Sequence, residues 1–435
     1  MKIKENKVLL ECILFGMHSF LAICEVLAYN EKNGNGALIG VIDMNEKKKA
    51  LVFPLILDGA TGTELTKRGM PQGACTERFV LEHPDVITAL QQEYIAAGSD
   101  AVLAPTFGAN RPTLERHGFK PEEVGQVCRD LFAISKAHAA GKLIAGDMSP
   151  TGFLMQPFGD TAPETVYNIY REQAATLLDC GVDFFFIETM IAAAEARLAV
   201  RAVRDLSKDI PVFVSMTVNE NGRTMYGDSL DAVLLTLIPF AIQGFGCNCS
   251  IGPVVIAKAL KPAAPIAKRY GIPLIAKPNA GMPVTDENGT HFPLTPKDMA
   301  GAVDGFVGLG VVIFGGCCGT IPAHIEAIAG AAKATEKARF SDVEDMEEGN
   351  YVSSSRVWAA VDPAAPYTAV DGDSEDDIYD LLDEVDPDEV LYLELNEGAA
   401  DVLIRMDAFI PNPVAVCGRE EEIEKLEKWL CRKVR

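Results

Sequence analysis

Between Leu55 and about Lys333, short apolar runs alternate with longer segments in which apolar residues recur at helical spacing. Such alternation predicts βα units and a parallel sheet. Eight apolar runs are candidate strands: Leu55–Asp58, Ala101–Thr106, Leu143–Asp147, Asp183–Glu188, Val212–Thr217, Gly244–Asn248, Leu274–Lys277 and Val311–Phe314. The helix-like segments are Pro84–Ala97, Glu122–Ala140, Pro163–Cys180, Ala192–Ser207, Leu230–Ile242, Pro253–Tyr270, Pro296–Val307 and Ile321–Lys337. Eight strands, each followed by a helix, predict an α/β fold of the (βα)8 TIM-barrel type over residues 51–340.

A doubly wound sheet is the alternative that this pattern leaves open. Such a fold normally carries a glycine-rich phosphate-binding loop after its first strand. The segment from Asp58 to Thr63 lies in that position, but its glycines lack the G-x-G-x-x-G spacing. The barrel is therefore the favoured architecture.

Residues 1–50 precede the barrel pattern and contain a mostly apolar run from Val8 to Tyr29. Its length would suit a membrane span. Three polar residues interrupt it at heptad spacing and would share one face of a helix: Glu11, His18 and Glu25. We therefore expect a helical N-terminal extension, or a translated leader upstream of a start at Met44, rather than a membrane anchor.

Residues 341–355 are acidic and contain several serines, which predicts a linker. Residues 356–435 then show a second, smaller α/β pattern: Arg356–Val361, Thr368–Val370, Val390–Leu395 and Val414–Val416 as strands, with Asp376–Val385 and Glu420–Lys433 as helices. Residues 341–435 hold 26 Asp and Glu against 8 Lys and Arg. We expect a small acidic C-terminal domain whose role no motif indicates.

The composition limits the classes of function. A net charge of −23 disfavours a nucleic-acid partner, which would need a basic surface. With 48% hydrophobic residues the chain can build a large core. Its 11 cysteines, an odd number in a long chain, argue against a disulfide framework and for free or metal-bound thiols. We expect a reducing, cytoplasmic location.

Polar side chains lie repeatedly at the carboxyl ends of the predicted strands, the face on which barrel enzymes build their sites. They are Asp58, Thr106, Asp147 and Glu188, with Cys249 just past the sixth strand and Cys317 and Cys318 just past the eighth. The six histidines form no cluster, so we do not expect a histidine metal site.

The adjacent pair Cys317-Cys318 closes an apolar run and is followed by glycine. The two cysteines cannot easily bond to each other, because disulfide geometry is specific. Both can face one soft metal ion, and Cys249 could supply a third thiolate, giving a zinc site of three cysteines with one open position. Buried structural cysteines are the alternative interpretation, and we expect nearby Cys247 to be a core residue.

Five motifs carry a resemblance to a known family: Asp58-Gly59-Ala60-Thr61-Gly62-Thr63, Thr106-Phe107-Gly108-Ala109-Asn110, Ile187-Glu188-Thr189-Met190, Gly246-Cys247-Asn248-Cys249 and Gly315-Gly316-Cys317-Cys318-Gly319-Thr320. From roughly Leu55 to Ala334 the chain resembles the zinc-dependent homocysteine S-methyltransferases. That family includes the homocysteine domain of cobalamin-dependent methionine synthase and betaine–homocysteine methyltransferase. The chain departs from the family pattern at Thr61 and at Ala104-Pro105-Thr106, both near the expected substrate pocket.

The resemblance implies that Cys249, Cys317 and Cys318 bind zinc. A free aliphatic thiol is mostly protonated at neutral pH and is a weak nucleophile. Zinc would lower the pKa of the homocysteine thiol at the open position and make it reactive toward a methyl group. The product thioether is a poor zinc ligand, which would favour its release.

The resemblance also implies a substrate site. Asp58 and Glu188 would hold the amino group by charge-assisted hydrogen bonds. Asn248 would belong to the substrate or metal surroundings, and we also expect Gly59 and Thr106 in the substrate site. Backbone N–H groups would bind the carboxylate at Gly59 and at four further glycines, Gly62, Gly315, Gly316 and Gly319.

Structural interpretations remain open for some of these positions. Asp58 could cap the turn at Thr61. Asp147 could be structural or peripheral. Glu188 follows an apolar run, so its buried carboxylate would need a partner.

The methyl donor is not identified by the sequence. No Asp-x-His-x-x-Gly cobalamin motif is present, so the donor would be free S-methylmethionine or betaine, or methylcobalamin on a separate corrinoid protein. We predict a zinc-dependent homocysteine S-methyltransferase that produces methionine. The alternatives are a methyltransferase or demethylase acting on another thiol with a corrinoid protein, and a non-catalytic homologue that binds thiols or a partner.

Overall fold

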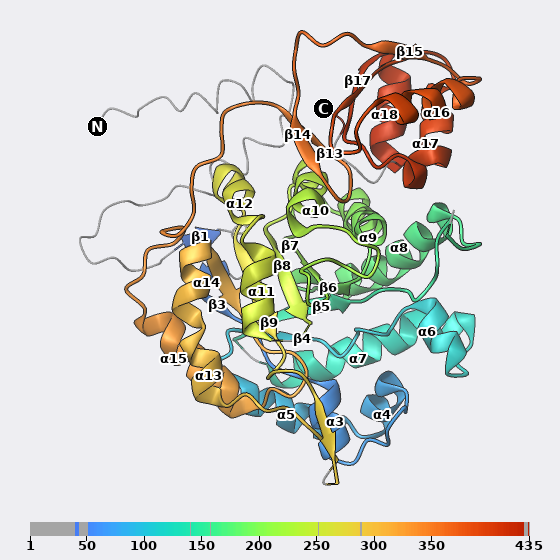
Figure 1. Cartoon of the computed structure of the whole chain (residues 1–435). Coiled ribbons are helices and arrows are strands. Elements are labelled where there is room, and N and C mark those ends of the chain that lie inside the picture. Colours follow the sequence, from blue (N-terminus) through green and yellow to red (C-terminus); the bar gives the residue numbers. More distant parts are fainter. Residues whose placement is uncertain are drawn as a thin grey trace, which may run out of the picture.

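The computed structural model describes residues 40–42, 51–139, 141–156, 158–250, 252–287, 289–429 and 434. Figure 1 shows a barrel of strands surrounded by helices, with a smaller α/β unit formed by the C-terminal part of the chain. The predicted helix within Val8–Tyr29 lies outside the described residues. Within the described ranges, no helix is both long enough and apolar enough to cross a membrane.

Eight parallel strands form the barrel sheet, in the order β3-β12-β9-β8-β7-β6-β5-β4. They are β3 (Leu55–Ile56), β4 (Ala101–Leu103), β5 (Leu143–Met148), β6 (Phe184–Met190), β7 (Val212–Met216), β8 (Gly244–Cys249), β9 (Leu274–Pro278) and β12 (Val311–Phe314). Each coincides with a predicted strand, so the predicted (βα)8 fold is confirmed. The last strand pairs with the first, Ile313 opposite Leu55.

The sheet has one weak seam, between β3 and β4, where single hydrogen bonds replace a regular ladder. The N–H of Asp100 donates to the carbonyl of Ile56 over 2.7 Å. The N–H of Leu103 donates to Oδ2 of Asp58 over 2.9 Å. A side-chain carboxylate thus stands in for a backbone carbonyl at the end of the seam.

The helices lie outside the sheet: α3 (Gly62–Lys67), α4 (Thr76–Glu82), α5 (Pro84–Ala96), α6 (Arg111–Arg116), η1 (Pro121–Glu123), α7 (Val124–His138), α8 (Pro163–Cys180), α9 (Ala193–Leu206), α10 (Leu230–Leu237), η2 (Ile238–Phe240), α11 (Pro253–Leu260), α12 (Ala264–Tyr270), α13 (Pro296–Gly301), α14 (Val303–Leu309) and α15 (Pro322–Ala334). Several begin with proline, which has a suitable φ and no N–H to leave unpaired at that position. An additional hairpin, β10 (Val284–Asp286) and β11 (Gly289–His291), follows β9.

Two apolar layers hold the barrel together. Side chains that alternate along the strands fill its interior, among them Leu55, Phe184, Phe213 and Ile313. A short antiparallel pair, β1 (Gly40–Ile42) and β2 (Leu51–Phe53), precedes the barrel, and Leu51 and Phe53 join the interior cluster. A larger cluster lies between the strands and the surrounding helices. The interior is therefore a packed core, as in other TIM barrels, and the polar site is confined to its end.

The predicted linker, residues 341–355, is fastened to the barrel. Phe340, Val343 and Met346 are partly buried against the main core. β13 (Tyr351–Ser353) pairs with β14 (Trp358–Ala360), and Nε1 of Trp358 donates to Asp231 at the start of α10 over 3.0 Å. The acidic composition of this segment predicted a linker, whereas these apolar residues attach it to the barrel.

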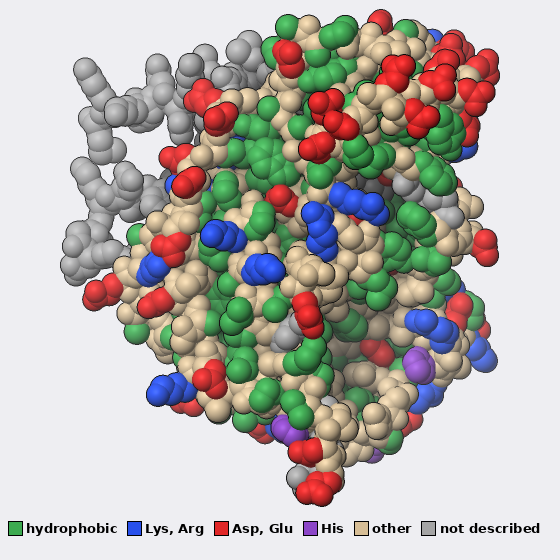
Figure 2. Space-filling view, in the orientation of Figure 1, with side chains coloured by type: hydrophobic (Ala, Val, Ile, Leu, Met, Phe, Trp, Pro, Cys, Tyr) green, Lys and Arg blue, Asp and Glu red, His purple; other side chains and the backbone are tan. Residues whose placement is uncertain are grey.

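The C-terminal unit has its own parallel sheet, β15 (Thr368–Val370), β16 (Leu391–Leu395) and β17 (Val414–Gly418), in that order. Its helices are α16 (Glu375–Glu384), α17 (Ala399–Met406), η3 (Asp407–Phe409) and α18 (Glu420–Trp429), and they pack with the sheet around a separate apolar cluster. Acidic side chains gather over this unit in Figure 2.

The C-terminal unit contacts the barrel through α18. Trp429 and Tyr167 of α8 both face the guanidinium of Arg201 in α9, with ring centroids 4.3 and 4.8 Å from its central carbon. The backbone carbonyl of Glu427 accepts a hydrogen bond from Arg197 over 2.8 Å. Two of the arginines on α9 therefore serve as attachment points for the unit.

Candidate metal and ligand site

Three thiols meet at the carboxyl end of the barrel. Cys249 is the last residue of β8, while Cys317 and Cys318 follow β12, with only β9 between the two strands. The three Sγ atoms lie within 4.8 Å of one another. In a tetrahedral zinc site with bonds of about 2.3 Å, sulfur atoms are about 3.8 Å apart. The donor set and its spacing therefore fit zinc with small adjustments.

The local backbone turns sharply at the first of these cysteines. Cys249 and Ser250 have φ values of 57° and 58°, in the left-handed region that non-glycine residues rarely adopt. Such strain is often found at functional sites, where the surrounding structure maintains it. Here it ends the strand and turns the chain immediately after Cys249.

The thiols influence one another's ionisation. Hydrogen bonds from Cys317 and Cys318 lower the pKa of the Cys249 thiol to about 3. The same contact with Cys249 raises the pKa of Cys318 well above its ordinary value. The close contact of the three sulfur atoms thus favours ionisation of Cys249, and a bound cation would displace protons from the thiols. Cys247, by contrast, is fully buried outside the trio, and burial raises its pKa to about 12.

Asn248 connects the thiols to the polar residues beside them. Its Nδ2 donates to Oε2 of Glu188 over 3.3 Å and lies 4.0 Å from Sγ of Cys317. Its Oδ1 accepts from the N–H of Thr189 and the hydroxyl of Ser215. With no exposed surface and all these partners, Asn248 supports the surroundings of the thiols.

Glu188 forms a buried ion pair that the sequence analysis missed. Nζ of Lys277, at the end of β9, lies 3.1 Å from Oε2 of Glu188. The two side chains are only 3% and 8% exposed. Burial raises the pKa of Glu188, and the Lys277 ammonium opposes this rise. The pair is consistent with the expectation that a carboxylate after this apolar run needs a partner.

Asp58 uses only one of its carboxylate oxygens within the protein. Oδ2 accepts the N–H of Leu103, whereas buried Oδ1 has no hydrogen-bond partner among the described residues. Burial raises the pKa of Asp58 to about 7. The carboxylate closes the strand seam and does not cap the turn at Thr61, where no side-chain cap is present.

Asp147, at the carboxyl end of β5, also has a buried Oδ1 without a partner in the described part of the chain. Burial raises its pKa well above the usual range, and the charge of Glu188 adds to this effect. The hydroxyl of Thr106 donates to the Asp147 carbonyl and accepts its N–H. Thr106 has no exposed surface, and through these two bonds it holds the backbone of Asp147 in place; its predicted place in the substrate site stays a prediction.

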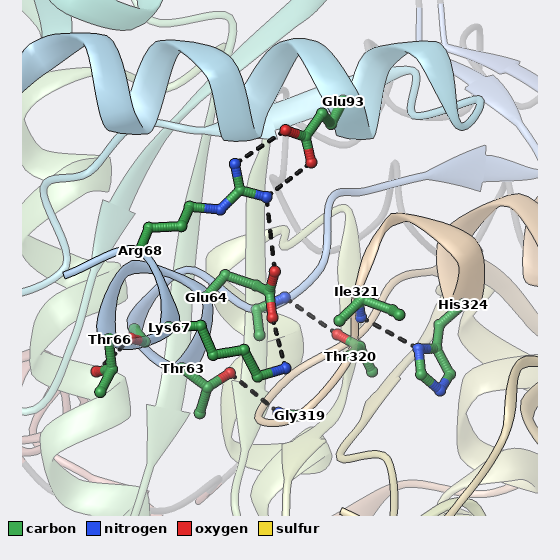
Figure 3. Close-up of polar contacts among 12 residues, drawn as sticks. Thr63, Glu64, Thr66, Lys67, Arg68, Glu93, Gly319, Thr320, Ile321 and His324 are labelled. Atoms are coloured by element: carbon green, nitrogen blue, oxygen red, sulfur yellow. Dashed lines mark hydrogen bonds and ion pairs between the residues drawn. The ribbon is translucent and has the colours of Figure 1, made fainter. Parts of the chain in front are cut away.

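The loops after β3 and β12 are joined by hydrogen bonds, which Figure 3 shows beside α3. Oγ1 of Thr320 accepts the N–H of Ala60 over 3.0 Å. Oγ1 of Thr63 accepts the N–H of Gly319 over 3.1 Å. These bonds connect the Asp58 loop to the loop that carries Cys317 and Cys318.

Three of the five glycine amides predicted to bind a carboxylate are already engaged. The N–H of Gly315 donates to Ala276, that of Gly316 to Asp58 and that of Gly319 to Thr63. This corrects the expectation for those three amides. The amides of Gly59 and Gly62 have no acceptor among the described residues. A Cβ at Gly59 would lie 2.7 Å from the Tyr94 ring, so the absence of a side chain is required there.

Most of the large apolar side chains that are exposed in the described part of the chain follow barrel strands. They are Phe107 after β4, Phe153, Leu154 and Phe158 after β5, Met225 after β7, Val254 after β8, and Met282 and Val284 after β9. They follow the strands on the same side of the barrel as the thiols, most of them in loops, with Val254 in α11 and Val284 in β10, and we call this set the apolar rim.

The structure brings the predicted residues Asp58, Glu188, Asn248 and the three cysteines to one end of the barrel. Sequence reasoning missed Lys277 and left a structural role open for Asp147. Both stand at the end of an apolar strand, the same signal that identified Asp58 and Glu188.

Comparison with known proteins supports the predicted family. The family model described as homocysteine S-methyltransferase matches residues 55–332. The chain belongs to this family. Over 301 residues it is 32% identical to methionine synthase of Mycobacterium tuberculosis (strain ATCC 25618 / H37Rv) and to that of Mycobacterium leprae (strain TN), an alignment covering 64% of this chain. It spans only 24% of the length of each of those relatives.

Solved structures agree on the fold. The homocysteine methyltransferase MmuM from Escherichia coli, in its oxidized form, aligns with a TM-score of 0.55 and 22% identity, covering 63% of this chain and 95% of that one. Its metallated form aligns with a TM-score of 0.54 and 21% identity, covering 64% and 96%. At this level of identity the likeness concerns the barrel architecture.

Proposed function

We propose that this protein transfers a methyl group to the thiol of homocysteine to give methionine, with zinc held by Cys249, Cys317 and Cys318. The observation that carries the proposal is the convergence of the three thiols in a barrel of the homocysteine S-methyltransferase family. Thiols must be reduced to hold a metal, so the proposal includes a reducing, cytoplasmic setting.

When bound, zinc supplies positive charge that favours the deprotonated, nucleophilic form of a nearby thiol. The chain's own residues would orient the substrate. Oδ1 of Asp58 and the Oε1 atom of Glu188 would accept hydrogen bonds from the substrate ammonium. The amide of Gly59 would donate to the substrate carboxylate. Asn248 would hold Glu188 and Cys317 in fixed positions relative to each other, since it contacts both.

The donor is proposed to be a methyl group carried on a corrinoid protein, ahead of free S-methylmethionine or betaine. The apolar rim supports this order, because exposed apolar side chains in several neighbouring loops suit contact with a macromolecular surface. A small free donor would need no such surface.

The test combines zinc analysis with methionine formation. Protein purified under reducing conditions is expected to hold one equivalent of zinc and to form methionine from homocysteine with one of the three donors. A Cys317→Ser variant should lose most of the zinc and at least roughly a hundredfold in rate, because a thiolate ligand is removed. Cys180→Ser, at the C-terminal end of α8, is the matched control and should retain both. Absence of zinc from the reduced wild-type protein would refute the proposal.

A further inference from the structure

Four ionisable residues are buried at the ends of four barrel strands: Asp58, Asp147, Glu188 and Lys277, each with at most 6% of the whole residue exposed. Their charges influence one another, since Glu188 raises the pKa of both aspartates and Lys277 lowers it. Three carboxylates thus share one internal cation. Buried carboxylates require compensation by charge or hydrogen bonds, and one lysine cannot provide it for all three.

Lys277 forms its ion pair with Glu188. Its ammonium contacts Oε2 of Glu188, which also accepts from Asn248. Nζ lies 5.6 Å from the centre of the Phe186 ring. A Cβ at Gly315 would meet Cγ of Lys277 at 2.9 Å, so the lysine stem is closely packed. The ion pair is therefore fixed in position.

Each of the two aspartates has a fully buried Oδ1 that lacks a partner among the described residues. Oδ1 of Asp58 and Oδ1 of Asp147 are both buried and accept no hydrogen bond from any described residue. Leaving such oxygens unpaired costs stability, so a retained pair of them points to a missing donor. The carboxylate of Asp147 is not needed to hold its own loop, because Thr106 already bonds both its N–H and its carbonyl.

We propose that Asp147 is a further ligand-binding residue: its Oδ1 and that of Asp58 together receive the ammonium of an amino-acid thiol, while Lys277 positions Glu188 beside them. This rests on the proposed function and names the group by which the site selects its substrate. An ammonium brings one positive charge and three N–H donors, which suits two unpartnered carboxylate oxygens and the second oxygen of Glu188.

A ligand must carry an ammonium group to bind tightly to this arrangement of carboxylates. A thiol with the same carbon chain but no amino group would leave both aspartate oxygens unpaired. Sites built around a buried polar contact reject analogues that lack the partner group. The pocket therefore selects α-amino thiols over simple thiols.

The experiment compares two ligands on the zinc-loaded protein by calorimetry: L-homocysteine and 4-sulfanylbutanoate, the same molecule without its amino group. The wild type should bind L-homocysteine at least roughly a hundredfold more tightly. Asp147→Asn should weaken L-homocysteine binding at least about tenfold, the range for one charge-assisted hydrogen bond, and change 4-sulfanylbutanoate binding less than about twofold. Equal losses for both ligands, or no loss for either, would overturn the proposal.

A second variant and a control separate ligand binding from folding. Lys277→Met should reduce the preference for L-homocysteine in the same way, with zinc content unchanged. Asp228→Asn is the matched control, because Asp228 is also buried but accepts from Ala193 and Thr224 within the protein. It should keep the wild-type preference.

The outcome also distinguishes this inference from the proposed function. A wild-type protein that prefers L-homocysteine through Asp147 but forms no methionine with any donor retains this inference and refutes methyl transfer. A protein that forms methionine without any preference for the amino group refutes this inference alone.

Discussion

At the scale of single residues, Asp58 combines two tasks in one carboxylate. One oxygen completes the seam between β3 and β4, and the other is left without a partner among the described residues. The first task explains why the residue is rigidly held. The second explains why its pKa is raised, because burial disfavours the charge that the ligand would need.

The raised pKa of Asp58 has a predictable effect on stability. Its pKa is about 7 in the folded chain and 3.8 ordinarily, so the unfolded chain ionises more readily. The free energy of unfolding should therefore fall as pH rises from about 4 to about 7, by up to about 4 kcal/mol from this group. In Asp58→Asn this contribution disappears, while the side-chain oxygen of the asparagine can still accept from Leu103.

Chemical denaturation of the wild type and Asp58→Asn at about pH 4, 5.5 and 7.5 would measure the effect. The free energy of unfolding of Asp58→Asn, relative to that of the wild type, should rise as the pH increases across that interval. If the free energy of unfolding depended on pH in the same way for both proteins, the pKa of Asp58 would be close to its ordinary value in the folded chain, which would contradict this prediction.

The same residues show what the sequence could and could not reveal. The rule that polar groups at strand ends form the site identified Asp58, Glu188 and the cysteines, because strand ends converge in any parallel barrel. It could not tell which oxygen of Asp58 would accept a backbone N–H and which would have no partner among the described residues. It also could not pair Lys277 with Glu188, since the two are brought together only by the order of the strands.

At the scale of elements, the loop after β12 determines where two of the three thiols lie. Gly319 follows them with a φ of 80°, and a Cβ there would lie 2.1 Å from the Phe292 ring. All eight barrel strands were predicted because apolar periodicity encodes them, but predicted Pro253–Tyr270 divides into α11 and α12, and Pro296–Val307 into α13 and α14. The hairpin of β10 and β11 was missed because its strands are short and carry no apolar alternation.

Gly319→Ala should disturb this loop, because it introduces both a strained φ and a clash. We expect a loss of about 1–3 kcal/mol in stability and a lower zinc content, measured by denaturation and by metal analysis. Gly330→Ala is the matched control: Gly330 lies within α15 with open space around it, and alanine there should stabilise the helix by up to about 1 kcal/mol. Equal effects of the two changes would contradict the role given to Gly319.

At the scale of the whole molecule, the acidic C-terminal unit has its own core but is held to the barrel by α18. Trp429 and Tyr167 enclose the guanidinium of Arg201, a contact that no local sequence pattern could indicate. The attachment lies on the outer helices α8 and α9. The unit should therefore loosen without affecting the thiols.

Trp429→Ala is expected to weaken the attachment by about 1–3 kcal/mol, the range for a lost aromatic contact with a cation and its packing. Hydrogen exchange in residues 362–429 should increase, while zinc content stays unchanged. Tyr379→Ala, an exposed aromatic residue of α16, is the control and should leave exchange as in the wild type. Unchanged exchange in both variants would mean that other contacts hold the unit.

The pairing of the first barrel strand with the last has a consequence for how the protein is made. A growing chain presents Asp58 early and Cys249 later, but Cys317 and Cys318 emerge only with the end of the barrel. Until β12 has left the ribosome, β3 and β9 expose unpaired edges and the thiol trio does not exist. The three thiols can therefore come together only after β12 and the loop behind it have been synthesised. A chain that stalls before β12 contains Cys249 but neither Cys317 nor Cys318.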